Sequence, residues 1–237
     1  MPADTVHRPE IVPQPPEPLE SNGRDALVAA LKGLAGLIPG VGWLVGELLG
    51  ATIPGQRLDR VIDTMGRLEA KLETAGQDIE EAKKKLASLE MLPVVEEALH
   101  QASRAFTEER RQHLANLLAV GVLSPDLDRA RLLAVLQVLR DLADEEIIIL
   151  AGKAHLPGTP PARAFFEKHH DLVAPRPPVI GGTEESRVRH GLHEYRLNRL
   201  ERLGLLKPGV AGPNAVTKLG DLVLSFLGVD IGRPIRL

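Results

Sequence analysis

The stretch QRLDRVIDTMGRLEAKLETAGQDIEEAKKKLASLE, residues 56–90, carries an apolar residue at every third or fourth position. Steps of three and four alternate along ten positions: Leu58, Val61, Met65, Leu68, Leu72, Ala75, Ile79, Ala82, Leu86 and Leu89. A repeat of this length predicts one long amphipathic helix with a coiled-coil-type seam, flanked by charged side chains. Two alanines and the internal Gly66 and Gly76 weaken the seam. It packs either within the chain or against a second copy, and both arrangements stay open.

The composition of the whole chain favours helices packed on helices. The chain has 237 residues, no cysteine and only 3% aromatic residues. We expect an all-α fold, because a β-sandwich would draw on aromatic and β-branched side chains. The lack of cysteine excludes disulfides and thiolate metal sites. A formal net charge of −3 excludes a polycation that coats nucleic acid along its whole surface.

Residues 1–20 contain six prolines and several acids, a composition that is typical of a disordered tail. They lack the basic segment followed by an apolar segment that a secretory signal needs. We therefore expect a cytoplasmic protein that can associate with the inner membrane.

Residues 21–55 are predicted to form an apolar helical hairpin that is broken at Pro39-Gly40. Gly42, Gly46 and Gly50 recur every four residues and therefore share one helix face. In membranes, small residues at this spacing let helices approach closely. We predict that the hairpin contacts a membrane or another subunit through Leu37, Gly40, Gly42, Trp43, Gly46, Leu49 and Gly50.

The length of the hairpin argues against a simple transmembrane span. Only fourteen uncharged residues separate Lys32 from Glu47. They span roughly 21 Å of helix at ~1.5 Å per residue, whereas a bilayer core is about 30 Å thick. A re-entrant or interfacial hairpin fits this length, and so does a hairpin buried in the core or between subunits.

Helix start signals continue after the seam. Pro93, Thr107, Ser124-Pro125 and Asp144 each begin an apolar periodic stretch, which predicts a long helix and a helical bundle over residues 56–154. Residues 155–182 contain six prolines and predict a linker with one short helical patch. In residues 183–237, a helix, a turn-rich loop, the strand-like Ala215-Val216-Thr217 and an apolar helix are typical of a winged-helix-like module.

The order of several segments resembles a known family. These are LIPGVG (37–42), QRLDR (56–60), SRAFTEERRQHLANLLA (103–119), HEYRLNRLERLGLL (193–206) and VTKLGDLVLSFLG (216–228). Together they resemble bacterial helical proteins of the abortive-infection type called Abi-alpha. The resemblance implies a role in bacterial defence or stress, and it brings no catalytic residue with it.

The motifs that would indicate catalysis are missing, and we expect no catalytic residue, no cofactor and no metal. The glycines at 36–42 do not match a phosphate-binding loop or a dinucleotide fingerprint. His190 and His193 are three residues apart without the HExxH pattern of a zinc helix. Asp126, Asp128 and the acids at 144–146 begin helices, where they complement the helix dipole.

The C-terminal segment is mildly basic, with nine Lys and Arg against six Asp and Glu in residues 184–237. Arg189, Arg196, Arg199 and Arg202 are candidates for contact with nucleic acid, although acids share their helix. Docking of a protein partner is at least as well supported. The sequence predicts a non-enzymatic defence or stress protein, a homo-oligomer whose hairpin associates with membrane or drives assembly. The alternative is a soluble DNA-binding regulator that uses the C-terminal module.

Overall fold

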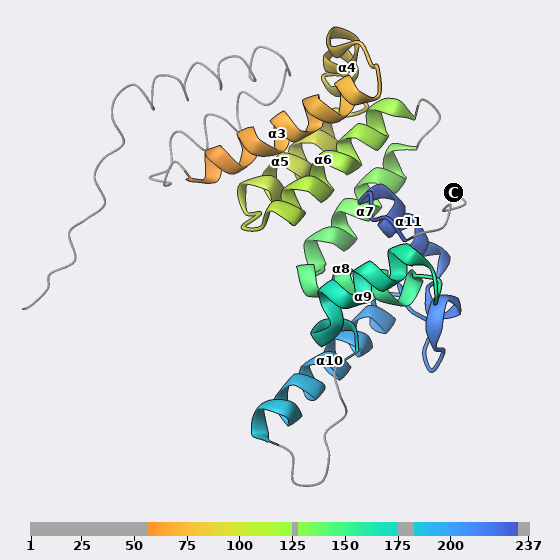
Figure 1. The fold of residues 1–237 in the computed structure, drawn as a ribbon. Helices are drawn as coiled ribbons and strands as arrows, with labels where there is room; N and C mark the ends of the chain where they lie inside the picture. Colours follow the sequence, from red (N-terminus) through yellow and green to blue (C-terminus); the bar gives the residue numbers. More distant parts are fainter. Residues whose placement is uncertain (1–55, 125–127, 175–182, 232–237) are drawn as a thin grey trace, which may run out of the picture.

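The computed structural model describes residues 56–124, 128–174 and 183–231. Within these ranges the chain is all-α, as predicted: nine α-helices, one 3-10 turn and one isolated β-bridge. The predicted tail and the hairpin with its seven contact residues lie outside the described residues. Figure 1 shows an upper layer of α3 (Gln56–Thr74), α5 (Leu92–Ser103) and α6 (Glu108–Leu123), with the later helices packed below it.

The prediction of one long helix over residues 56–90 is wrong. The seam is divided between α3 and α4 (Ile79–Leu86). Gly76 adopts φ +67°, and the N–H groups of Gly76 and Gln77 donate to the carbonyls of Glu73 and Leu72, each at 2.9 Å. This is the hydrogen-bond pattern of a Schellman stop. Asp78 then caps α4 by accepting from the Glu81 N–H at 2.8 Å, so local capping overrides the continuous apolar repeat.

The seam is buried within the chain. Val61, Leu68 and Leu72 of α3 are at most 3% exposed, and α3 packs on α6 and α5. A polar contact edges this interface, where Asp63 accepts from Arg67 at 2.9 Å and from Arg111. Burial raises the pKa of Asp63, but the two guanidinium groups outweigh it and lower the pKa overall. Leu89, beyond the break, is 86% exposed, so it does not belong to the seam.

Two helix starts differ from the sequence prediction. α7 (Arg129–Asp141) is capped by Asp128, which accepts from the Ala130 N–H at 2.9 Å. α8 (Asp144–Ala154) has Ala143 at its N-cap, and Glu146 reaches back to accept the Ala143 N–H at 2.8 Å. Asp144 is therefore inside the helix, where its side chain is free to bridge to another element.

The range predicted as a linker contains α9 (Pro160–Val173), a helix of 14 residues. Thr159 caps it and two prolines occupy its first positions, where they satisfy the geometry of a helix start. α9 packs along α8. Gly152 of α8 permits the close approach, because a Cβ there would lie 2.7 Å from Cγ1 of Val173. Residues 160–173 are thus part of the body.

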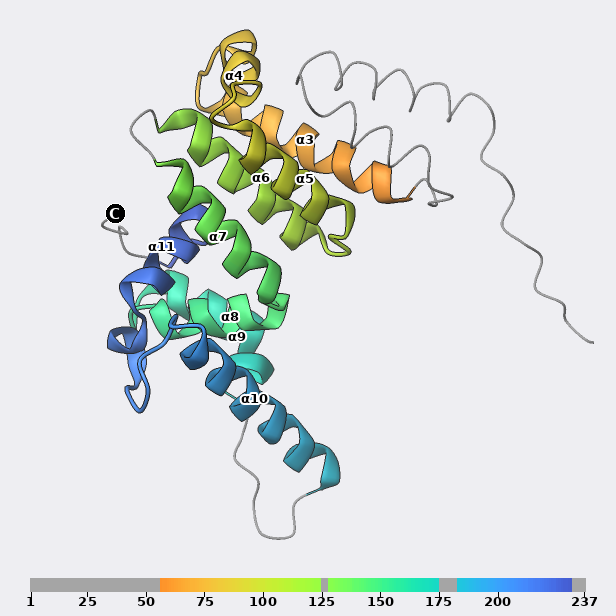
Figure 2. The ribbon, with the colours of Figure 1, turned by 180° about the vertical axis from the view of Figure 1, so that it is seen from behind.

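The C-terminal helices share the core of the body. α10 (Glu184–Arg202) leads to a bridge between Leu206 and Val216, a 3-10 turn η1 (Gly212–Ala215) and α11 (Lys218–Phe226). Ala215 lies in the turn and not in a strand. Val223, Leu224 and Phe226 are fully buried, because α11 packs on α6, α7 and α8. Figure 2 shows α11 beside α7, with α10 extending away from the body.

Leu72→Asp tests the buried seam. An unpaired charge in this contact should lower the free energy of unfolding by about 3 kcal/mol. Leu89→Asp is the matched control, since the sequence repeat contains both leucines but only Leu72 is buried; it should change stability by about 0.5 kcal/mol or less. Urea unfolding followed by circular dichroism measures both, and equal effects would contradict the divided helix.

Candidate functional site

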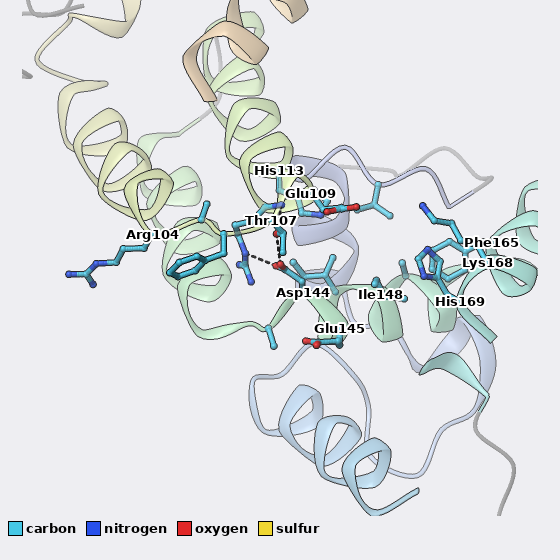
Figure 3. Close-up of a pocket in the computed structure, with 17 residues that line it drawn as sticks. Arg104, Thr107, Glu109, His113, Asp144, Glu145, Ile148, Phe165, Lys168 and His169 are labelled. Atoms are coloured by element: carbon cyan, nitrogen blue, oxygen red, sulfur yellow. Dashed lines mark hydrogen bonds and ion pairs between the residues drawn. The ribbon is translucent and has the colours of Figure 1, made fainter. Parts of the chain in front are cut away.

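The candidate site is a groove of about 650 Å³ between the start of α6, the start of α8 and the end of α9. Figure 3 shows Thr107 and Asp144 close together near its centre, between Arg104 on one side and Phe165, Lys168 and His169 of α9 on the other. Much of its lining is apolar and is contributed by Ile147, Ile148, Ala151, Phe165 and Val229. Three helices distant in sequence therefore form one apolar surface with charged groups around it.

Hydrogen bonds and an ion pair connect the start of α6 to the start of α8 beside the groove. Asp144 accepts from the Thr107 hydroxyl at 2.5 Å and pairs with Nε of Arg110 at 2.7 Å. Arg110 also donates to the carbonyl of Leu139 at 2.7 Å and to that of Leu142 at 2.5 Å. One guanidinium thus satisfies carbonyls at the end of α7 and a carboxylate at the start of α8. Charge-assisted hydrogen bonds of this kind are stronger than neutral ones.

His113 joins α6 to the end of α11 beside the same groove. Its Nδ1 lies 3.0 Å from the carbonyl of Leu227, which also accepts from Asn116 Nδ2. Because a carbonyl only accepts, Nδ1 carries the hydrogen. Burial lowers the pKa of His113, since the charged imidazolium loses its hydration. The two α6 side chains therefore anchor α11 through one oxygen.

The aromatic end of the groove is built around α9. The Phe165 ring lies 4.8 Å from His169 and 4.5 Å from His155, measured between ring centroids. α9 is kinked at His169, and burial lowers the pKa of both histidines. These rings, which are tilted against each other, provide contact area, while Lys168 adds a positive charge.

The four candidate arginines do not form one phosphate-facing set. Arg196 lies 3.8 Å from Glu145, and Arg199 lies 3.4 Å from the buried Glu146 and donates to the Asp141 carbonyl. Arg189 pairs with Glu185 at 2.8 Å, and Arg202 donates back to Asn198 at 3.4 Å. Acids of α8 therefore face two of the four arginines, Arg196 and Arg199.

The two histidines of α10 have different surroundings. His190 lies 3.3 Å from Glu194, and burial lowers the pKa of His193. In residues 56–124, 128–174 and 183–231, no three His, Cys, Asp or Glu side chains are grouped to hold a metal ion. Among the helices described, none has both the length and the apolar character needed to cross a bilayer.

The groove was not predicted from the sequence. The sequence indicates Thr107 and the acids at 144–146 only as helix-start signals, and such signals do not reveal that the two starts meet. The aromatic residues at 165–169 fell in the range predicted as a linker. Comparison with family models, curated proteins and solved structures finds no match to this chain.

Lowering the pH should destabilise the fold through His113. Its pKa in the folded state is below the ordinary value, so the unfolded chain takes up a proton first as the pH falls. Stability is therefore full above about pH 6.5 and declines below it, by up to about 1.4 kcal/mol per pH unit for each shifted histidine. Urea unfolding between about pH 7.5 and about pH 5 measures the slope.

His113→Asn is the matched variant, because its amide can still donate to Leu227 but does not titrate. It should show a shallower decline of stability with falling pH than the unmodified chain. An identical slope in the two proteins would exclude His113 as a contributor.

Proposed function

We propose that this chain is a non-enzymatic bacterial defence or stress protein, in which a helical body carries the glycine-rich hairpin of residues 21–55. The hairpin associates with a membrane or drives assembly. The resemblance to the Abi-alpha type supports the defence role. The observation that carries the proposal is the burial of the α3 seam: its apolar side chains pack against α5 and α6.

The seam is informative because it directly follows the hairpin. A hairpin buried against α3 would need the apolar face of α3 as its cover. Val61, Leu68 and Leu72 already use this face inside the body. An apolar segment with Gly42, Gly46 and Gly50 on one face then gains most by contacting lipid or another hairpin, since these glycines cost about 1 kcal/mol each relative to alanine in a helix.

The polar groups of the groove support a non-enzymatic role. Asp144 pairs with Arg110 of α6, Arg110 also donates to the carbonyl of Leu139 in α7, and His113 bonds to the carbonyl of Leu227 after α11. Side chains used in this way fix the relative positions of α6, α7, α8 and α11. We assign the groove a structural and contact role in the proposal.

Leakage of dye from anionic vesicles tests the hairpin. The full chain should release the dye, and the chain without residues 26–54 should not. Gly46→Leu should abolish release, because a leucine fills the close contact even though it raises helix propensity. Gly66→Leu is the control: Gly66 is exposed on α3, and an added Cβ there meets no atom within 4 Å. Equal release by the Gly46→Leu and Gly66→Leu variants would contradict the glycine contact.

Trp43 reports on the environment of the hairpin, because it is the single tryptophan of the chain. On insertion, its emission should shift to the blue and become protected from an aqueous quencher when anionic vesicles are added. If the emission is already blue and protected without lipid, and no lipid changes it, the hairpin is buried in protein and does not associate with a membrane.

The alternative, a DNA-binding regulator, is weakened by the partners of the arginines. A guanidinium beside a carboxylate would have to exchange that partner for phosphate. We expect the unmodified chain to bind duplex DNA only weakly. Arg196→Glu should bind about as weakly as Arg131→Glu, which changes a surface residue of α7 and serves as the control. Specific binding that falls steeply with salt and is lost only in Arg196→Glu would establish the alternative.

A further inference from the structure

The groove of the candidate site is large enough for an organic ligand. Its volume of about 650 Å³ far exceeds the need of a water molecule or an ion, and it falls within the range of about 300–1,000 Å³ that is typical of ligand pockets. Ile147, Ile148, Ala151, Phe165 and Val229 make much of its lining apolar. An apolar chain that lies on these side chains removes its own surface and theirs from water.

Three charged side chains of the lining are not used within the body. The remaining carboxylates and the remaining guanidinium group of the lining form ion pairs. In contrast, Arg104, Glu109 and Lys168 are exposed, and their side chains make no hydrogen bond or ion pair with any residue of the described ranges. These three groups are therefore available to a ligand.

Glu109 and Lys168 approach the groove from different helices. Glu109 lies in the first turn of α6 and Lys168 lies on α9 (Figure 3). Both act on His169: burial lowers the pKa of this histidine most, Lys168 lowers it further and Glu109 raises it. A carboxylate and an ammonium group thus lie near one part of the groove without pairing with each other.

This arrangement matches a ligand that carries both charges at one end of an apolar chain. A simple acid is attracted by Lys168 and repelled by Glu109, and a simple amine experiences the reverse. A phosphoethanolamine headgroup is complementary to both. Its phosphate can accept hydrogen bonds from the Lys168 ammonium group, and its own ammonium group can donate to the Glu109 carboxylate. The chain of such a lipid suits the apolar lining.

We propose that the groove binds one single-chain zwitterionic phospholipid, with its phosphate at Lys168, its ammonium group at Glu109 and its acyl chain on Ile148, Phe165 and Val229. The occupant is a lipid monomer held by the helical body, and not a bilayer surface. The site is separate from the hairpin of residues 21–55 and does not rest on the function proposed for it.

Equilibrium dialysis of the full chain against two lysolipids tests the site. Lauroyl lysophosphatidylethanolamine and lauroyl lysophosphatidylglycerol, each kept below micelle formation, share the phosphate and the chain, but only the first carries an ammonium group. The unmodified chain should bind the first with a Kd of about 10 µM or tighter, and about fivefold more tightly than the second. No binding of either lysolipid at about 100 µM overturns the proposal.

Two exposed side chains give separable results. Glu109→Gln should weaken binding of the ethanolamine lipid about fivefold but not that of the glycerol lipid, because it removes an attraction for one and a repulsion for the other. Lys168→Gln should weaken both, since both contain phosphate. Glu108→Gln is the control, because Glu108 lies 3.8 Å from Arg67 of α3 and does not line the groove. Equal weakening of both lipids by Glu109→Gln overturns the headgroup assignment.

The acyl chain and the hairpin are tested separately. Shortening the lauroyl chain to decanoyl should weaken binding about tenfold, because two methylene groups leave the apolar lining; an unchanged affinity overturns the proposal. Lysolipid binding that Gly46→Leu retains and Lys168→Gln loses supports the groove. Binding that is lost in Gly46→Leu and unchanged in Lys168→Gln places the lipid on the hairpin and overturns the proposal.

Discussion

Burial of the middle of α6, residues 114–119, on all sides is the constraint on which the other helices depend. Leu114, Leu117 and Leu118 are fully buried, and the helix contacts α3 and α5 on one side and α7 and α11 on others. Gly121 keeps this packing close, because a Cβ there would lie 2.8 Å from Cε of Met91. A helix that is covered all round fixes the position of its neighbours, since each of them loses apolar burial if it shifts.

The three acids in the first turn of α8 form ion pairs with arginines of two other helices. Asp144 pairs with Arg110 of α6, while Glu145 and Glu146 face Arg196 and Arg199 of α10. Acids are favourable at a helix N-terminus because they complement its dipole. Here the same three acids also connect α8 to helices that precede and follow it. The basic C-terminal segment is thus partly neutralised by the body.

The proposed function places the contact with membrane or with another copy in the hairpin of residues 21–55. The hairpin is apolar and rich in glycine, which suits contact with lipid or another hairpin.

The sequence by itself determined the fold class and some helix starts, because a capping residue such as Thr107 acts on the N–H group three residues away. Thr217 caps α11 in the same way, although the sequence predicts a strand-like segment there. The stop at Gly76 was also a local signal, but the apolar repeat hid it. Tertiary structure alone decided that Leu72 is buried and Leu89 exposed, and that Asp144 meets Arg110. Such pairs are set by how whole helices pack, so no spacing along the chain encodes them. The groove follows from the same packing, since it joins helix ends that are more than thirty residues apart in the sequence.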